Sequence, residues 1–378
     1  MQTEWIDLPS PAPGTQRRLR RVRLGPPQAA RRVHIQAALH ADEIPGLLVA
    51  SHLLALLEQL EGQGALRSGI DLVPMANPVG LSQEVMGRHQ GRFDQGTGGN
   101  FNRAFLPLTD KLEARLAGRW TDDAEANTRL VREASLTLLD EALASAWSET
   151  AWMKLQLQRW GAEAELVLDL HCDSVAVMHL YTHTEAAGVF QGLADHLGAR
   201  AVLLAEVSGG DPYDESLSRH WVELAARYPL HIGARAVTVE LRGETDVNDD
   251  WARQDAVAIL RFLASQGHVD GALLEACCGP AAVPPKACEP TMLDAVETLH
   301  APHAGVVIYR AKPGDRIEAG QTVAEVLCPL THQRTLLQAR HAGLLYAHNL
   351  RRHAVRGMDV ARIAGTVRVI EDGPLLGL

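Results

Sequence analysis

Apolar runs alternate along the chain with stretches whose apolar positions recur at helical spacing. The apolar runs have the length and residue types of buried strands, and they span residues 31–39, 69–77, 164–173, 175–183 and 234–243. Helical patterns lie between them, at residues 46–60 and within the charged region 110–160. Strands separated by helices predict an α/β fold in which a mixed central sheet carries helices on both faces. Ligands of such sheets gather at the carboxyl ends of the strands.

The pattern changes toward the C-terminus. Residues 277–291 contain several Pro and Cys residues, which is typical of a linker. Beyond them, residues 301–327 and 339–365 alternate short apolar runs with Gly turns, which predicts a small all-β barrel or sandwich. We therefore expect two domains, residues 1–287 and residues 288–378.

Composition narrows the class of protein. The 378 residues are 46% hydrophobic and 22% charged, with a net charge of −10, so the chain lacks the basic character of a nucleic-acid-binding protein. No apolar run reaches the ~18 residues of a membrane span, and the first residues lack the pattern of a signal peptide. Five cysteines without a telling spacing suggest reduced thiols. These features predict a cytoplasmic protein with neither nucleic acid nor membrane as a partner.

Polar residues with metal-binding chemistry follow three of the predicted strands. His40 and Glu43 come just after the first strand, His171 ends a second strand, and Glu240 ends a third. Zinc accepts His nitrogen and carboxylate oxygen, and a catalytic zinc site keeps three protein ligands and one water. His40, Glu43 and His171 could supply those ligands. Glu240 is then the candidate general base of a hydrolysis reaction.

The pair His40–Glu43 is not diagnostic by itself. The chain has 17 histidines and 46 acidic residues, so about two His-x-x-acid pairs are expected by chance. The alternative is that both residues lie on the first turn of a helix and have no role in a site. The remaining motifs of the chain therefore decide between the two interpretations.

A Gly-rich segment at residues 91–105 adds further candidates. It contains Arg92, Asn102 and Arg103. An arginine can hold a carboxylate with two parallel hydrogen bonds, and another arginine can stabilise a developing oxyanion. The alternative for this segment is an ordinary polar surface loop.

Together and in order, these motifs resemble the zinc carboxypeptidase superfamily, and within it the succinylglutamate desuccinylase/aspartoacylase branch. The resemblance spans roughly residues 30–285 and rests on four motifs, HADE (40–43), GRFDQGTGGNFNR (91–103), LVLDLHCD (166–173) and VTVELRG (237–243). It implies one Zn²⁺ per chain, bound by His40, Glu43 and His171. It also implies that Glu240 is the general base and proton shuttle and that Arg92 polarises the scissile carbonyl.

The same resemblance assigns residues to the substrate. It implies that Asn102 and Arg103 hold a substrate carboxylate. Tyr213 lies in a segment with neighbouring glycines, and we expect it to close over the substrate. The carboxylates of the same segment, Asp211, Asp214 and Glu215, would favour a cationic group in the substrate; the alternative is that they form a solvated turn.

The residues around His171 depart from the commoner family pattern. Cys172 and Asp173 follow the histidine where small residues are more usual. Asp169 precedes it by two positions and could orient the histidine through a hydrogen bond, or else face a neighbouring backbone.

These roles predict a zinc-dependent hydrolase of amide bonds. The expected substrate is a small N-acyl amino acid, or an isopeptide-type dipeptide, with a free carboxylate; a basic amino-acid part, as in β-aspartyl-arginine, is one candidate. Two alternatives stay open: a metallocarboxypeptidase that acts on longer peptides, and a non-catalytic zinc-binding protein.

The predicted C-terminal domain resembles a biotinyl/lipoyl domain. Carrier domains of that type need a lysine on the hairpin between their halves, and residues 328–338 contain none. We therefore expect a structural cap that shapes access to the site or helps to build an oligomer. The resemblance to the branch also implies a homo-oligomer, with a dimer as the expected state.

Overall fold

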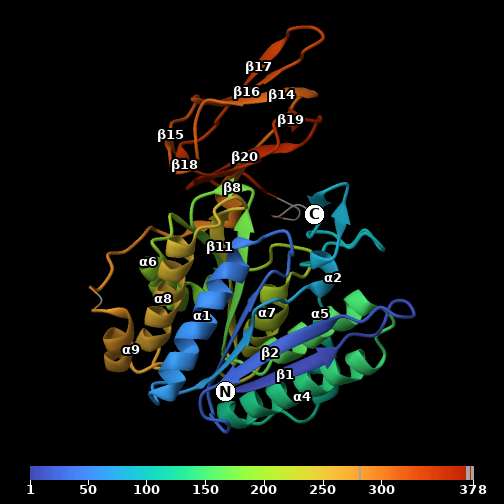
Figure 1. Cartoon of the computed structure of the whole chain (residues 1–378), viewed down its shortest axis with the longest axis vertical. Helices are drawn as coiled ribbons and strands as arrows, with labels where there is room; N and C mark the ends of the chain where they lie inside the picture. The colour runs from blue at the N-terminus through green and yellow to red at the C-terminus, as the bar shows by residue number, and fades with distance from the viewer. Residues whose placement is uncertain (281, 372–374, 376–378) are drawn as a thin grey trace.

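The computed structural model describes residues 1–280, 282–371 and 375, and its centre is a nine-stranded mixed sheet (Figure 1). The strand order is β1-β2-β4-β3-β7-β11-β9-β10-β12. Their bounds are β1 Gln2–Asp7, β2 Arg18–Leu24, β3 Arg32–Ala37, β4 Gly69–Val73, β7 Leu166–Asp173, β9 His179–His183, β10 Ala201–Ala205, β11 Arg235–Gly243 and β12 Thr291–Met292. Strands β4, β3, β7 and β11 run parallel, whereas β9 pairs antiparallel with β11.

Helices cover both faces of this sheet, as predicted. The helices on one face share a core with it and are α1 Pro45–Gly62, α6 Ala187–Leu197, α8 Asp249–Ser265 and α9 Gly271–Cys278. Those on the other face are α3 Thr109–Leu116, α4 Ala124–Ala144, α5 Glu149–Gly161 and α7 Tyr213–Ala225. Strand β7 lies between the two cores and is buried from Leu166 to Cys172, which explains its near-continuous apolar sequence.

Short elements connect α1 to α3. Helix α2 spans Pro78–Leu81, and strands β5 (Glu84–Val85) and β6 (Arg88–His89) form a small hairpin. Single 3₁₀ turns, η1 at Thr184–Ala186 and η2 at Leu293–Ala295, precede α6 and the C-terminal strands. Among the described residues, no helix has both the length and the apolar character that crossing a membrane would require.

The C-terminal residues form two antiparallel sheets, at one end of the molecule (Figure 1). One has the order β13-β20-β18-β15 and the other β17-β16-β14-β19. Their bounds are β13 Val296–His300, β14 Gly305–Tyr309, β15 Arg316–Ile317, β16 Thr322–Leu327, β17 Arg334–Gln338, β18 Gly343–His348, β19 His353–Ala354 and β20 Asp359–Gly365. Apolar residues from both sheets share a single core. The resemblance to a biotinyl/lipoyl domain stays a prediction.

Two short strands join the C-terminal sheets to the rest of the molecule. Strand β8 (Val175–Ala176) directly follows β7 and pairs with β18. Strand β12 precedes the C-terminal sheets and pairs with β10 at the edge of the central sheet. A group of apolar residues, here named the interface cluster, fills the space between them and consists of Ala201, Leu203, Leu293, Val296, Leu344, Tyr346, Ala347 and Ala364. The predicted division between residues 287 and 288 stays a prediction.

Candidate active site

The loop after β3 brings the first candidate residues to the carboxyl end of the sheet. It leaves the strand at Ala38, whose φ of +59° lies in the left-handed region that residues with a side chain rarely adopt. The loop then packs against the segment that carries Arg92: the Ala41 amide donates a hydrogen bond of 2.9 Å to the carbonyl of Gly91. A Cβ atom on Gly91 would lie 2.0 Å from the Asp42 nitrogen, so only glycine permits this contact. The two segments are therefore fixed to each other.

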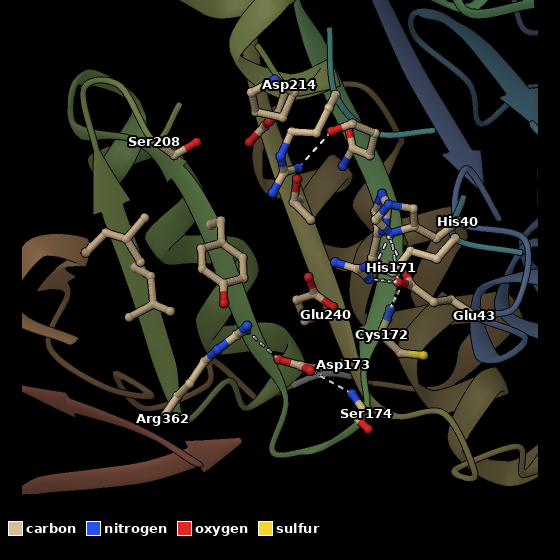
Figure 2. A pocket seen from close by; sticks show the side chains of 18 of the residues that line it. His40, Glu43, His171, Cys172, Asp173, Ser174, Ser208, Asp214, Glu240 and Arg362 are labelled. Carbon is tan, nitrogen blue, oxygen red and sulfur yellow. Dashed lines mark hydrogen bonds and ion pairs between the residues drawn. The ribbon is translucent and has the colours of Figure 1, made fainter. Parts of the chain in front are cut away.

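His40, Glu43 and His171 point toward one another in the pocket (Figure 2). The Nδ1 atom of His40 lies 2.9 Å from Glu43 Oε1, and the Nδ1 atom of His171 lies 2.8 Å from Glu43 Oε2. The Cys172 amide also donates to Glu43 Oε2, at 3.0 Å. All three side chains are buried, with exposed fractions of 2–4%. Residues separated by 128 positions in the sequence thus form one compact group.

The outer nitrogen of each histidine also has a partner. His40 Nε2 lies 2.8 Å from Asn100 Oδ1, and His171 Nε2 lies 2.8 Å from Asp169 Oδ2. Such contacts fix the tautomer and the ring orientation of a metal-binding histidine. Of the two alternatives for Asp169, the structure shows the contact with the histidine ring. Asn100 was missed, although it belongs to the Gly-rich motif and its position before Phe101-Asn102 was visible in the sequence.

This group has the donor set of a metal site. One donor atom from each of His40, Glu43 and His171 can be chosen so that all three lie within 4.8 Å of one another. Burial opposes ionisation of Glu43, but His171 and His40 hold its pKa well below the usual range, so its carboxylate is charged. Burial, followed by the charge of Arg92, lowers the pKa of His40, which favours the neutral ring that a metal ion needs. Two imidazoles and one carboxylate suit zinc and leave a position open.

Glu240 lies on β11 directly beside His171 on β7. Its Oε2 atom is buried and has no hydrogen-bond partner among the described residues. Burial and the nearby Glu43 raise the pKa of Glu240 to about 8. A carboxyl group with these properties can take up and release a proton near neutral pH.

The Gly-rich segment brings its two arginines to the same pocket. Arg92 Nη1 lies 3.2 Å from Glu43 Oε1 and 3.3 Å from His40 Nδ1. Arg103 Nη1 donates to the Asn102 carbonyl at 2.7 Å, and burial lowers the pKa of Arg103. The predicted loop is therefore part of the site rather than a solvated surface.

The pocket has a volume of about 390 Å³, which is suitable for a small molecule. Seven of the eight predicted site residues line it: His40, Glu43, Arg92, Asn102, Arg103, His171 and Glu240. The described residues that line it include eight carboxylates and three guanidinium groups. Burial raises the pKa of Glu240, Asp214 and Glu244 to about 7–8, so part of these carboxyl groups is protonated near neutral pH.

The prediction that Tyr213 closes over the substrate is wrong. Tyr213 is fully buried, its hydroxyl donates to the Leu157 carbonyl at 3.0 Å, and its ring packs on Phe105. Pro212 precedes it and α7 begins at Tyr213, so this segment is a helix start rather than a mobile lid. Its backbone amide does serve the site indirectly, because it donates to Asn102 Oδ1 at 2.8 Å and so orients that side chain.

The carboxylates after Tyr213 do line the pocket. Asp214 and Glu215 are both nearly buried, with exposed fractions of 8% and 9%. Burial and the neighbouring Glu215 raise the pKa of Asp214 to about 7. Glu215 Oε1 accepts a hydrogen bond from the Ser208 amide, whereas its Oε2 has no partner among the described residues. The alternative of a solvated turn is therefore wrong for these two residues, whereas the Asp211 side chain is 41% exposed and lies outside the pocket.

The C-terminal sheets supply one wall of the pocket. Asn349, Asp359 and Arg362 line it, although they lie more than 100 residues beyond the last predicted site residue. Arg362 Nη1 lies 3.3 Å from Asp173 Oδ2 (Figure 2). Sequence reasoning missed these residues because no local motif marks them.

The family model of the succinylglutamate desuccinylase/aspartoacylase catalytic domain matches residues 29–266. The chain belongs to this family. The family is one of deacylases, which is consistent with hydrolysis of N-acyl amino acids, and the His-Glu-His group of this chain could hold a metal ion. No curated protein matches the chain.

Solved structures of this family have the same fold over nearly the whole chain. A family protein from Shewanella amazonensis is 25% identical, with a TM-score of 0.80, and the match covers 96% of this chain and 98% of that one. A second, from Shewanella frigidimarina, is 22% identical with a TM-score of 0.80 and coverage of 96% and 97%. The ectoine utilization protein EutE from Ruegeria pomeroyi is 16% identical with a TM-score of 0.67 and coverage of 97% and 95%.

Proposed function

We propose that this protein is a zinc-dependent amidohydrolase that cleaves a small N-acyl amino acid or an isopeptide-type dipeptide. The observation that carries the proposal is that His40, Glu43, His171 and Glu240 all line one pocket. The three metal-binding side chains without a nearby general base would be typical of a structural metal site. A general base without them would be typical of hydrolysis that uses no metal ion. Their combination suits metal-assisted hydrolysis.

Each residue has a defined part in the proposed reaction. A bound Zn²⁺ would polarise the substrate carbonyl and make a water molecule more acidic. Glu240 accepts the proton of the attacking water at Oε2 and later returns it to the departing amine nitrogen. The guanidinium of Arg92 stabilises the negative charge that develops on the carbonyl oxygen. Asn102 and Arg103 hold the free carboxylate of the amino-acid part.

The amino-acid part of the proposed substrate is basic. Asp214 and Glu215 lie beside the Asn102–Arg103 clamp, and both electrostatically influence Arg103. A Lys or Arg side chain would place its cation against these carboxylates. The excess of carboxylates over guanidinium groups in the whole pocket supports the same choice.

Two alternatives have less support. A carboxypeptidase for long peptides needs an open cleft, whereas Asn349, Asp359 and Arg362 wall this pocket on the C-terminal side. A non-catalytic zinc protein would not need a buried carboxyl such as Glu240 beside the metal group. The predicted dimer and cytoplasmic location stay predictions, as does the structural rather than carrier role of the C-terminal sheets.

Elemental analysis of the purified protein tests the metal proposal first. We expect about one zinc per chain in the wild type and its loss in His171→Ala. His183→Ala is the matched control, because His183 lines the same pocket but lies outside the metal group, so this variant should keep its zinc. A wild-type protein that binds no zinc even after supplementation would contradict the proposal.

A further inference from the structure

Three charged side chains contact one another where the C-terminal sheets meet the central sheet at the pocket. Arg362 on β20 stands between Asp173, at the end of β7, and Asp359, at the start of β20. Its Nη1 lies 3.3 Å from Asp173 Oδ2, and its Nη2 lies 3.4 Å from Asp359 Oδ2. The second oxygen of Asp359 lies 3.0 Å from His300 Nδ1. We name Asp173, Arg362 and Asp359 the charged row.

The charged row can exchange its internal contacts for contacts to a ligand. Its two ion-pair distances exceed the 2.7–2.9 Å of tight charge-assisted hydrogen bonds. The Arg362 side chain is 29% exposed, and Figure 2 shows it pointing into the pocket from the C-terminal strand. Asp173 and Asp359 line the same pocket. A small substrate can therefore reach all three residues.

The position of the charged row assigns it to one part of the substrate. Figure 2 shows Asp214 and Arg362 at opposite ends of the pocket, with Glu240 between them. Asp214 lies beside the clamp proposed for the amino-acid part. The part on the other side of the scissile bond, which is the acyl group, then extends toward Arg362.

The order of charges decides what kind of acyl group fits. Two carboxylates share one guanidinium, so the row carries a net charge of −1. A simple anion would gain little there, because Asp173 and Asp359 flank the only cation of the row. The charges of the row alternate: negative at Asp173, positive at Arg362 and negative at Asp359. A group with an ammonium and a carboxylate on the same carbon matches these charges, since its carboxylate can face Arg362 while its ammonium faces an aspartate.

We propose that the charged row is the acyl subsite and that it selects acyl groups bearing both an ammonium and a carboxylate, as in β-aspartyl or γ-glutamyl units. This inference rests on the proposed amidohydrolase function and names the substrate class. The substrate is then an isopeptide whose amino-acid part is basic. Hydrolysis breaks the side-chain amide C–N bond, adds the hydroxyl of water to the acyl carbon and leaves the remaining proton on the amine.

Paired substrates test the subsite in the zinc-loaded, full-length protein. β-Aspartyl-arginine and succinyl-arginine differ by one ammonium group, as do γ-glutamyl-arginine and glutaryl-arginine; acetyl-arginine has neither charge. We expect kcat/KM for one of the two aminoacyl substrates to exceed that of its unaminated partner at least ~10-fold. The acyl carboxylate of either substrate competes with the aspartates for Arg362, and only the ammonium gives an aspartate a new cationic partner in return.

Variants of the row separate recognition from folding. Arg362→Met should lower kcat/KM for the preferred aminoacyl substrate much more than kcat/KM for acetyl-arginine, with zinc content near wild type. Arg362→Lys should keep part of the advantage over acetyl-arginine, because the cation remains. Arg340→Met is the matched control, since Arg340 lies in the connection between β17 and β18, is 83% exposed and lies outside the pocket.

The outcomes distinguish this inference from the function on which it rests. A wild-type preference for succinyl-, glutaryl- or acetyl-arginine would overturn the subsite and keep the amidohydrolase. An equal loss on all substrates in Arg362→Met would also overturn the subsite, because it would indicate a structural role. Absence of turnover on every substrate by zinc-loaded wild type would overturn both proposals.

Discussion

Asp169 shows how strongly the proposed metal site depends on a residue that would not touch the metal. Its carboxylate holds His171 Nε2 and also accepts a 3.0 Å hydrogen bond from Gln36 Nε2, so the aspartate is itself fixed on both sides. Burial opposes protonation of His171, yet Asp169 and Glu43 raise the pKa of this ring well above its ordinary value. The ring is therefore oriented before any metal arrives.

Replacing Asp169 by Asn should weaken zinc binding about 10–100-fold, because the orienting hydrogen bond loses its charge. Competition with a chelator of known affinity measures the change. Asp140→Asn is the control, since the Asp140 side chain on α4 is 57% exposed and contacts only Arg159 among the described ion-pair partners. Equal zinc affinity in wild type and D169N would mean that Asp169 does not contribute to zinc binding.

Replacing Glu240 by Gln should lower kcat by about 10²–10⁴-fold, because the side chain can no longer accept a proton. Zinc content should stay near one per chain, since Glu240 is not among the proposed ligands. Single-turnover assays on the best substrate, run beside elemental analysis, measure both quantities. Substantial turnover by zinc-loaded E240Q would mean that another group is the base.

At the scale of elements, the strands that carry the site were predictable and the helix that supports it was not. Strands β3, β7 and β11 are buried on both faces, so their apolar runs and polar ends stand out in the sequence. Helix α7 begins with Pro, Tyr and two acidic residues, a composition that also occurs in loops. Arg362 is 189 positions from its partner Asp173, and no local pattern encodes such a contact.

Replacing Tyr213 by Phe tests the corrected role of the α7 start. We expect a loss of about 1 kcal/mol in the free energy of unfolding, because the Leu157 carbonyl loses a buried hydrogen bond, and an unchanged kcat/KM. Tyr228→Phe is the control, since the Tyr228 hydroxyl contacts Glu113 near the surface and should matter less. A large fall in kcat/KM without destabilisation would mean that the Tyr213 hydroxyl acts on the substrate after all.

At the scale of the whole molecule, buried histidines make stability depend on pH. Burial lowers the pKa of His34 to about 4 and that of His220 to about 3, below the ordinary value of 6.5. Arg132 lowers the pKa of His220 further, while Glu223 opposes this. Both rings are neutral in the folded protein near neutral pH, whereas in the unfolded chain they bind protons as the pH falls below 6.5.

The stability that these two rings contribute should therefore be complete above pH 6.5 and fall as the pH drops toward their folded-state pKa values of about 4 and about 3, whereas buried carboxyl groups with raised pKa values, such as Asp214, contribute with the opposite sign. Each ring contributes a slope of up to about 1.4 kcal/mol per pH unit within that window. Urea unfolding between pH 7 and 4 measures the slope. His220→Leu should reduce it by one ring's share, since both nitrogens of His220 lack partners among the described side chains and leucine fills similar space. An unaltered slope in H220L would contradict the lowered pKa of His220 in the folded protein.

The pairing of β12 with β10 limits how this chain can be shortened. β12 lies in the connection to the C-terminal sheets, yet it completes the edge of the central sheet. A protein cut between residues 287 and 288 would lose β12 and leave β10 with an open row of hydrogen-bonding groups. The cut would also uncover Leu203 and its neighbours in the interface cluster. Open strand edges beside apolar surface promote aggregation, so the smallest well-behaved expression product extends through the C-terminal sheets.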